Sequence, residues 1–262
     1  MVIIDREKCV GCGLCALDCL ARAISVEDGR AAIVKGCFHC GHCVAICPAE
    51  AVRIEGGDYD MRDVEPVGAG FGVGAEAFLH AVKTRRSIRQ FGRECPSRAE
   101  LETILEAGCF SPTASNAQNV SYIVFTEGTE RLRALAMAEL RKLKDDEQAF
   151  YTVFPPPMSL SRVHFEDDDF LFKGAPAVIL TVSPHAVNAA IASCNMEMEA
   201  AALGLGALYV GFFARLAAHS EALRSFLGLK PEDTVVTCLA LGPPAVEYQR
   251  TVPRRKAQID WR

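Results

Sequence analysis

Four cysteines stand in the stretch Cys9-Val10-Gly11-Cys12-Gly13-Leu14-Cys15-Ala16-Leu17-Asp18-Cys19, separated by two, two and three residues. The same spacing returns 28 residues later, at Cys37, Cys40, Cys43 and Cys47. The residues after the fourth cysteine repeat as well, because Ala, Ala, Ile or Val, Glu and Gly occupy matching places in residues 19–29 and 47–57. The repeat predicts a duplicated unit built around two cysteine tetrads.

The spacing within each tetrad favours an iron–sulfur cluster over a structural zinc site. Zinc sites use two C-x2-C pairs with a longer loop between them, so that the ligands form a tetrahedron. Three cysteines at consecutive x2 spacings instead suit three corners of a cubane cluster. Gly11, Gly13 and Gly41 allow the backbone to pass close to inorganic sulfide. Structural zinc or free thiols are the alternative interpretation.

The distribution of cysteine indicates a reducing compartment. The chain has 262 residues and 12 cysteines, eight of which fall within the first 47 residues. We expect the other four, Cys95, Cys109, Cys194 and Cys238, to be buried apolar residues. The N-terminus lacks the basic start and the apolar segment of a secretory signal peptide. These features predict a cytoplasmic protein whose thiols stay reduced and available as ligands.

Charge and hydropathy argue against two classes of partner. The net charge is −5, and neither the cysteine-rich part nor the remainder has the basic excess of a nucleic-acid-binding protein. The longest apolar run, residues 200–214, has 15 residues. A helix that crosses a bilayer needs about 18 to 20 apolar residues. We therefore expect neither a nucleic acid nor a membrane as a partner.

The composition divides the chain into three parts. We predict a cluster domain over residues 1–58, a linker over residues 59–75 and a larger domain over residues 76–262. The linker is rich in Gly and Asp and has no helical or strand period, which favours a flexible tether. Its glycines, Gly68, Gly70, Gly72 and Gly74, follow no strand of a βαβ unit, so a hinge is a better interpretation than a dinucleotide loop.

The larger domain alternates between helical and strand patterns. Ser97 and Glu100 form a capping-box pattern that predicts the start of a helix. Runs rich in β-branched and apolar residues predict strands over residues 120–126, 177–182 and 235–241. Helical composition returns over residues 130–144 and 188–203. The pattern predicts an α+β domain with a small central sheet flanked by helices.

A basic run follows the first predicted helix of this domain. Arg85, Arg86, Ser87 and Arg89 place three guanidinium groups and one hydroxyl within five positions. Arg is well shaped for bidentate contact with phosphate, so the run is a candidate anion site. The alternative is a solvated basic face.

The cysteine-rich part resembles the two-cluster bacterial ferredoxins, in which the fourth cysteine of each run ligates the other cluster. The resemblance implies two [4Fe-4S] clusters. One cluster would be held by Cys9, Cys12, Cys15 and Cys47. The other would be held by Cys19, Cys37, Cys40 and Cys43.

Residues 76–262 resemble the FMN-dependent nitroreductase family over almost their whole length. The resemblance rests on the order and spacing of five motifs, which are residues 85–91, 111–118, 173–178 and 204–211, and residues 241–243 with 253–256. It implies an oxidoreductase that binds FMN at the subunit interface of a homodimer. The fold it implies is a central sheet flanked by helices.

The resemblance also implies roles for single residues. Arg85, Arg86, Ser87 and Arg89 match the run that binds the phosphate and ribityl chain of FMN. Arg254 and Lys256 match a basic pair that closes on the same phosphate, and Arg255 could replace either of them. Pro112, Thr113, Ala114 and Asn116 match a loop that reaches the flavin from the other subunit. Val210 and Gly211 match the segment whose backbone N–H approaches flavin N5.

Together these features predict an oxidoreductase in which the clusters relay electrons to or from FMN. FMN would then reduce a small acceptor, apolar or aromatic, by two electrons. Ferredoxin or another redox protein is a plausible donor, because the chain has no separate dinucleotide-binding domain. No residue is nominated as a general acid. Flavin-consuming chemistry is disfavoured because it uses oxygen, to which exposed clusters are sensitive.

Two questions stay open at this point. The alternative function is a non-catalytic electron carrier or redox sensor that docks a protein partner. The stretch 150–172 is rich in aromatic residues and proline, and it would be either a lid over an apolar pocket or ordinary packing.

Overall fold

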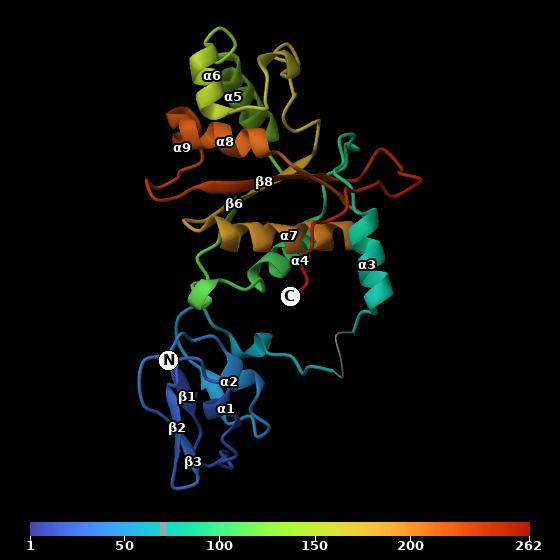
Figure 1. The fold of residues 1–262 in the computed structure, drawn as a ribbon. Coiled ribbons are helices and arrows are strands. Elements are labelled where there is room, and N and C mark those ends of the chain that lie inside the picture. The colour runs from blue at the N-terminus through green and yellow to red at the C-terminus, as the bar shows by residue number, and fades with distance from the viewer. Residues whose placement is uncertain (69–71) are drawn as a thin grey trace. The chain divides into compact units, whose positions relative to one another are not determined.

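The computed structural model describes residues 1–68 and 72–262 of the chain. Gly70 of the predicted tether lies outside the described residues. The chain divides into two compact units (Figure 1). The first unit comprises Met1–Gly72 together with Thr113–Ala117, and the second comprises Val73–Pro112 and Gln118–Arg262. The two units are described separately below.

The first unit repeats its backbone structure as the sequence repeats. Two antiparallel strand pairs are formed, β1 (Val2–Ile4) with β4 (Val52–Ile54) and β2 (Ile24–Glu27) with β3 (Arg30–Ile33). Two short helices complete it, α1 (Leu14–Leu17) and α2 (His42–Ala45). A shift of 28 residues carries α1 onto α2 and the start of β2 onto the start of β4. The duplication predicted from the cysteine spacing is therefore present in the fold.

A glycine begins each of these two short helices. Gly13 precedes α1 with φ 76°, and Gly41 precedes α2 with φ 77°. These are left-handed conformations, which cost an L-residue with a side chain about 1 to 2 kcal/mol. Both tetrads therefore enter their helix through the same turn. A 3-10 turn, η1 (Met61–Asp63), follows β4.

The second unit is built on one antiparallel sheet. Its strands are β5 (Ser121–Phe125), β6 (Ala177–Val182), β7 (Gly206–Tyr209) and β8 (Val235–Gly242), in the order β5-β6-β8-β7. The helices in chain order are α3 (Ala75–Thr84), α4 (Arg98–Cys109), α5 (Thr129–Arg141), α6 (Glu147–Val153), α7 (Ala186–Ala202), α8 (Gly211–His219) and α9 (Glu221–Phe226). A 3-10 turn, η3 (Leu160–Arg162), follows α6.

The central strand β6 separates two apolar cores. Its side chains alternate, since Val178, Leu180 and Val182 face a core shared with α5, α6, α8 and α9. Ala177 and Ile179 face the other core, with residues of α4 and α7. Figure 1 shows these two helix layers on opposite faces of the sheet. The predicted α+β fold with a helix-flanked central sheet is confirmed.

Most predicted elements of this unit are present, and one strand was missed. The Ser97 hydroxyl accepts from the N–H of Glu100, and the Glu100 carboxylate accepts from the N–H of Ser97, so the capping box begins α4 as predicted. The strand β7 was not predicted, because it has only four residues inside a glycine-rich motif. β7 is held by antiparallel pairing with β8, in which Gly206 lies opposite Gly242.

Three of the four cysteines outside the tetrads do not follow the prediction. Cys238 is buried on β8, whereas Cys95, Cys109 and Cys194 are exposed. Cys109 on α4 is adjacent to the buried Gly108, but it lies on another face of the helix. An apolar sequence neighbourhood therefore did not place these side chains in the core.

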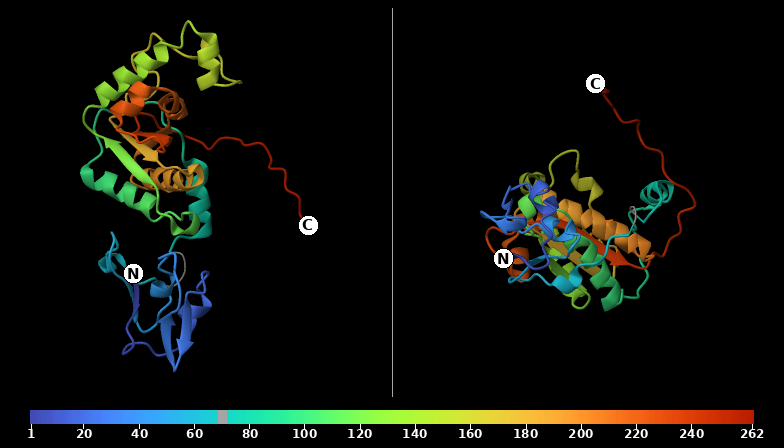
Figure 2. Two further views of the ribbon diagram at one scale, coloured as in Figure 1. Left: turned by 90° about the vertical axis from the view of Figure 1, so that its left-hand side faces the viewer. Right: turned by 90° about the horizontal axis from the view of Figure 1, so that it is seen from below.

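The chain ends in an extended segment. Residues 251–262 form no helix or strand and are exposed (Figure 2). In the described part of the chain, we find no helix with the length and apolar character required to traverse a bilayer.

Candidate functional site

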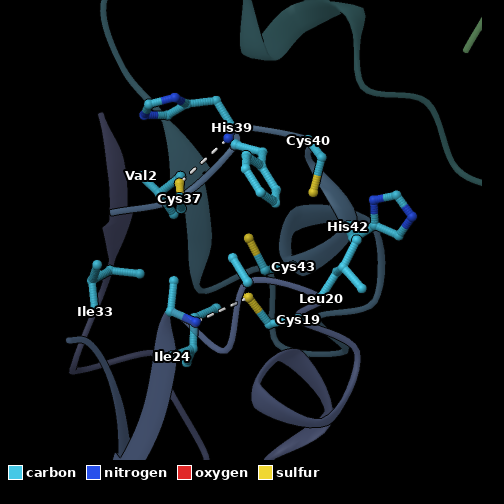
Figure 3. A pocket seen from close by; sticks show the side chains of 13 residues that line it. Val2, Cys19, Leu20, Ile24, Ile33, Cys37, His39, Cys40, His42 and Cys43 are labelled. Atoms are coloured by element: carbon cyan, nitrogen blue, oxygen red, sulfur yellow. Dashed lines mark hydrogen bonds between the residues drawn. The ribbon is translucent and has the colours of Figure 1, made fainter. Parts of the chain in front are cut away.

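The eight tetrad cysteines surround two hollows in the first unit. The first hollow, of about 330 Å³, is lined by Cys9, Cys12, Cys15 and Cys47. The second hollow, of about 430 Å³, is lined by Cys19, Cys37, Cys40 and Cys43 (Figure 3). Each hollow thus takes three cysteines from one tetrad and the fourth from the other. This is the grouping that the resemblance to two-cluster ferredoxins implied.

Backbone N–H groups point at several of these sulfur atoms. Cys19 Sγ accepts from the N–H of Ala23, and Cys47 Sγ accepts from the N–H of Ala51, both at 3.3 Å. The two bonds are equivalent under the 28-residue repeat. Two further bonds are donated by Ala31 to Cys9 at 3.3 Å and by His39 to Cys37 at 3.4 Å. Such bonds stabilise negative charge on sulfur and raise the reduction potential of a bound cluster.

Hydrogen bonds and burial also shift the pKa values of three of these thiols. The N–H of Ala31 lowers the pKa of Cys9, which favours the thiolate that ligates metal. Burial raises the pKa of Cys15 and of Cys43, because a thiolate in an apolar environment loses hydration. A bound cation would reverse the effect of burial at both positions.

The histidines near the second hollow turn away from its sulfur atoms. Figure 3 shows the rings of His39 and His42 directed outward from the four cysteine side chains. Among the described residues, no three His, Cys, Asp or Glu side chains are close enough together to hold a single metal ion. The arrangement of sulfur atoms around a hollow fits a group larger than one ion.

In the second unit the basic run lies along the edge of β7. The N–H of Ile88 donates to the carbonyl of Ala207 at 3.0 Å, and Ser87 bridges Ala207 in parallel. Gly206 makes this approach possible, because a Cβ there would lie 2.6 Å from Ile88 Cγ1. Farther on, the N–H of Gly92 donates to the carbonyl of Pro243. The first, fourth and fifth sequence motifs therefore meet at this edge of the sheet.

Arg85 at the end of α3 is held by a buried carboxylate. Its Nη1 donates to Glu197 Oε1 on α7 at 2.7 Å, and the Glu197 side chain is only 8% exposed. Burial raises the pKa of Glu197, and the positive charge of Arg85 offsets part of that rise. Burial also raises the pKa of Tyr209, with a further contribution from the charge of Glu197. Glu197 was not singled out in the sequence, because 112 residues separate it from Arg85.

We expect replacement of Arg85 by Ala to leave Glu197 buried without its partner and to lower the free energy of unfolding by about 2 to 3 kcal/mol. A carboxyl group with a raised pKa stabilises the folded state when protonated, and that contribution is lost as pH rises through its folded pKa. The deficit should therefore grow from about pH 5 to about pH 8 in denaturant titrations. The Arg85→Ala/Glu197→Gln double variant should recover most of it. An equal deficit at both pH values would contradict the assignment.

Arg86 lies beside Tyr248 and has one guanidinium nitrogen without a hydrogen-bond partner in the described part of the chain. Its Nε is buried without a hydrogen-bond partner, and its Cζ lies 5.6 Å from the centre of the Tyr248 ring. The Tyr248 hydroxyl donates to the carbonyl of Ser87 at 3.4 Å, which fixes the ring beside the basic run. Arg89 is exposed and, within the described chain, makes no hydrogen bond or ion pair.

Val210 and Gly211 lie where β7 passes into α8. The N–H of Val210 donates to the carbonyl of Cys238 at 2.8 Å, so it is already used within the sheet. Gly211 is exposed at the first position of α8, where a helix N–H has no partner within the helix. A Cβ at Gly211 would meet no atom within 4 Å. Of the two predicted donors, only Gly211 can offer its N–H to a ligand.

The remaining predicted flavin residues belong to other segments of the chain. Pro112 ends the segment of the second unit that precedes the loop 113–117, whereas Thr113, Ala114 and Asn116 belong to the first unit. Arg254 and Lys256 are exposed in the extended segment 251–262. In the described part of the chain, neither makes a hydrogen bond or ion pair.

Most of the aromatic side chains in the stretch 150–172 belong to the core. Phe150, Phe154 and Phe172 are each at most 2% exposed. Phe154 and Phe170 lie 5.0 and 5.9 Å from Phe212, the residue after Gly211, measured between ring centres. Ordinary packing is therefore the correct interpretation of these aromatic residues, and they support the start of α8.

Known families match both units. Residues 82–243 match the model of the nitroreductase family, and residues 1–57 match the model of the 4Fe-4S dicluster domain. An Archaeoglobus fulgidus protein, provisionally named NADH dehydrogenase/NAD(P)H nitroreductase, is 27% identical over 173 residues. That alignment covers 66% of this chain and 88% of the relative.

Solved structures show the fold of the second unit. A Bacteroides fragilis nitroreductase with bound FMN has a TM-score of 0.54 and 19% identity, covering 70% of this chain and 97% of that chain. An FMN- and NADPH-dependent nitroreductase from Sphingopyxis sp. strain HMH has a TM-score of 0.56 and 20% identity, covering 70% and 98%. At 19% and 20% sequence identity, the similarity to these structures shows a shared fold and nothing more.

Proposed function

The chain belongs to the nitroreductase family, and on that premise we propose that it is an FMN-dependent oxidoreductase in which two [4Fe-4S] clusters exchange electrons with the flavin. The observation that carries the proposal is the pair of hollows, each lined by four cysteines, in the same chain as the family domain. When bound, the clusters carry one electron at a time, and FMN accepts two.

The proposed cluster ligands are the cysteines that line each hollow. Cys9, Cys12, Cys15 and Cys47 would hold one cluster, and Cys19, Cys37, Cys40 and Cys43 the other. The grouping across the two tetrads and the N–H···S bonds support this assignment. We also propose three segments in the chain. The clusters would lie in residues 1–58, a tether would span residues 59–75, and the flavin domain would comprise residues 76–262.

The proposed FMN contacts start from the edge of β7. Arg86 would bind the phosphate through its guanidinium, whose buried Nε has no hydrogen-bond partner in the described chain, assisted by Arg85, Ser87 and Arg89. Gly211 would donate its N–H to flavin N5, where charge develops on reduction. Arg254 and Lys256 would add positive charge at the phosphate, because neither side chain makes a hydrogen bond or ion pair within the described chain.

A homodimer would complete this site. The second unit exposes apolar side chains on several helices, including Leu79 and Val82 of α3, Val187 of α7 and Phe110 after α4. Contiguous exposed apolar surface marks a contact face, and these side chains are the candidates for one. We propose that the flavin lies at this subunit interface, with Pro112, Thr113, Ala114 and Asn116 of one subunit serving the flavin of the other.

The electron donor would dock on the cluster domain, and the electron acceptor would bind at the flavin. We propose a reduced ferredoxin or a similar iron–sulfur protein as donor, because docking on the cluster domain would require no dinucleotide site. The acceptor would be a small apolar or aromatic molecule that takes two electrons from the flavin. Protons would come from water or from the substrate.

Cofactor analysis and a turnover assay test this function. Anaerobically purified protein should contain close to eight irons per chain, as two [4Fe-4S] clusters require, and one FMN. With reduced ferredoxin as donor, it should turn over a nitroaromatic, a quinone or an enone repeatedly. Stoichiometric reduction without turnover of any of the three would instead support a non-catalytic electron carrier or redox sensor.

A further inference from the structure

The hairpin formed by β2 and β3 ends in a tight turn that lies against the first cysteine tetrad. Asp28 and Gly29 form this turn with φ 50° and 70°, as a two-residue connection between antiparallel strands requires. Gly11, which stands between Cys9 and Cys12, contacts the turn. A Cβ at Gly11 would lie 2.1 Å from the carbonyl oxygen of Gly29, so only glycine admits the turn at this distance.

This contact brings the backbone of β3 to a tetrad sulfur atom. Ala31 of β3 lies opposite Val26 of β2 in the hairpin. Its N–H donates to Cys9 Sγ at 3.3 Å, and the bond joins residues that are 22 positions apart in the sequence. Ala31 is 4% exposed, and both residues line the first hollow. The hydrogen bond is therefore shielded from water, where its effect on charge is strongest.

The second hollow has no equivalent of this bond among the described residues. β1 contributes Val2 to the lining of the second hollow, yet within the described chain β1 donates no N–H bond to a tetrad sulfur. β1 and β4 stand at opposite ends of the repeat, so no tight turn joins them. His39, 28 residues after Gly11, has a side chain directed away from the cysteines (Figure 3). The bonds donated by Ala23 and Ala51, in contrast, are equivalent and serve one hollow each.

We propose that the turn of the β2–β3 hairpin tunes one cluster only: packed against Gly11, it holds the N–H of Ala31 at Cys9 Sγ and so raises the reduction potential of the cluster in the first hollow. The inference rests on the proposed function, which supplies the two clusters. Gly11 and Ala31 are then positioning residues, and they change the potential of the first cluster relative to that of the second.

The physical reason is the charge that reduction adds. A cluster that takes one electron from the external iron–sulfur donor gains one negative charge, which is shared with its thiolate ligands. A hydrogen bond to a ligand sulfur stabilises the reduced cluster more than the oxidised one, and this raises the potential. The N–H of Ala31 also lowers the pKa of Cys9, because it stabilises negative charge on the same sulfur.

Removing the donor alone tests the role of Ala31. Replacing Ala31 by its α-hydroxy acid, lactic acid, through nonsense suppression puts an ester oxygen where the N–H stood and keeps the methyl side chain. The same exchange at Ala32, whose backbone pairs with Ser25 of β2, is the matched control for the ester. Anaerobic full-length protein would be titrated with dithionite, and the electron paramagnetic resonance signal of each reduced cluster would be recorded against potential. Cys12→Ser and Cys40→Ser, which each remove a ligand from one hollow, assign the signals.

In the Ala31 ester we expect the ratio of reduced to oxidised first cluster, at a fixed potential, to fall by about three- to tenfold, which is about 30 to 60 mV for one electron. The second cluster of the same molecule and both clusters of the Ala32 ester should keep their wild-type midpoint potentials. An unchanged midpoint of the first cluster would overturn the proposal, as would equal shifts of both clusters.

Gly11→Ala tests the packing of the turn by a second route. Its Cβ displaces the turn at Gly29, so the midpoint of the first cluster should fall and that of the second should stay. Iron content is measured alongside, and the Ala31 ester, which keeps the side-chain packing, decides the proposal in either case. A wild-type protein without clusters would instead refute the proposed function, whereas two clusters with unresponsive midpoints would refute this inference alone.

Discussion

Replacing Cys12 and Cys40 together by Ser is expected to abolish reduction of FMN by ferredoxin, by about a hundredfold or more in rate, because each hollow loses one of its four ligands. Both side chains are exposed, so the exchange of sulfur for oxygen removes little packing. Rapid mixing with reduced ferredoxin measures the rate, and iron analysis measures the loss of clusters.

A cysteine pair outside the hollows provides the matched control. Cys109 and Cys194 are also exposed, and Ser at both positions should leave iron content and ferredoxin-driven reduction unchanged. Direct reduction of the flavin by a hydride donor should survive in both double variants. Normal reduction by ferredoxin in the Cys12→Ser/Cys40→Ser protein would show that electrons reach FMN by another route.

Replacing Arg86 by Ala is expected to weaken FMN binding by about 10- to 100-fold, which is the effect of losing charge-assisted hydrogen bonds to a phosphate. The buried Nε without a partner is the reason to choose Arg86 over Arg85, whose guanidinium already binds Glu197. The FMN affinity of Arg86→Lys should lie between those of Arg86→Ala and the wild type, since Lys keeps the positive charge but lacks the planar guanidinium fork. Fluorescence titration of the apoprotein with FMN measures the affinity.

The control for this prediction is Arg98→Ala on α4. The Arg98 side chain is 87% exposed and pairs with Glu102 one turn away, so its removal should leave FMN affinity unchanged. Loss of the contact between Arg86 and the Tyr248 ring should cost about 1 kcal/mol or less of folding stability. If Arg86→Ala bound FMN as tightly as the wild type while unfolding normally, the phosphate assignment would be wrong.

The sequence was most informative where its pattern repeats or caps an element. The 28-residue repeat predicted a duplicated unit, and the fold repeats with it from α1 to α2. The capping box at Ser97 placed the start of α4 within one residue. Runs rich in β-branched and apolar residues predicted β5, β6 and β8, and the fold class and family were confirmed by the matches to residues 1–57 and 82–243.

Contacts between distant segments could not be predicted in the same way. The ion pair between Arg85 and Glu197 forms because the end of α3 lies beside α7. No local sequence pattern predicts that contact. The strand β7 is too short and too rich in small residues to carry a strand signal, and it exists because β8 pairs with it. The exposure of Cys95, Cys109 and Cys194 likewise depends on which face of an element meets the core.

One measurement tests most directly whether electrons pass from the clusters to FMN. Anaerobic wild-type protein would be mixed with a limited amount of reduced ferredoxin, and the absorbance of the clusters and of the flavin would be followed in one experiment. The account predicts that the clusters are reduced first, and that they are then reoxidised at the rate at which FMN becomes reduced. Flavin reduction that precedes cluster reduction, or clusters that stay reduced beside oxidised FMN, would contradict it.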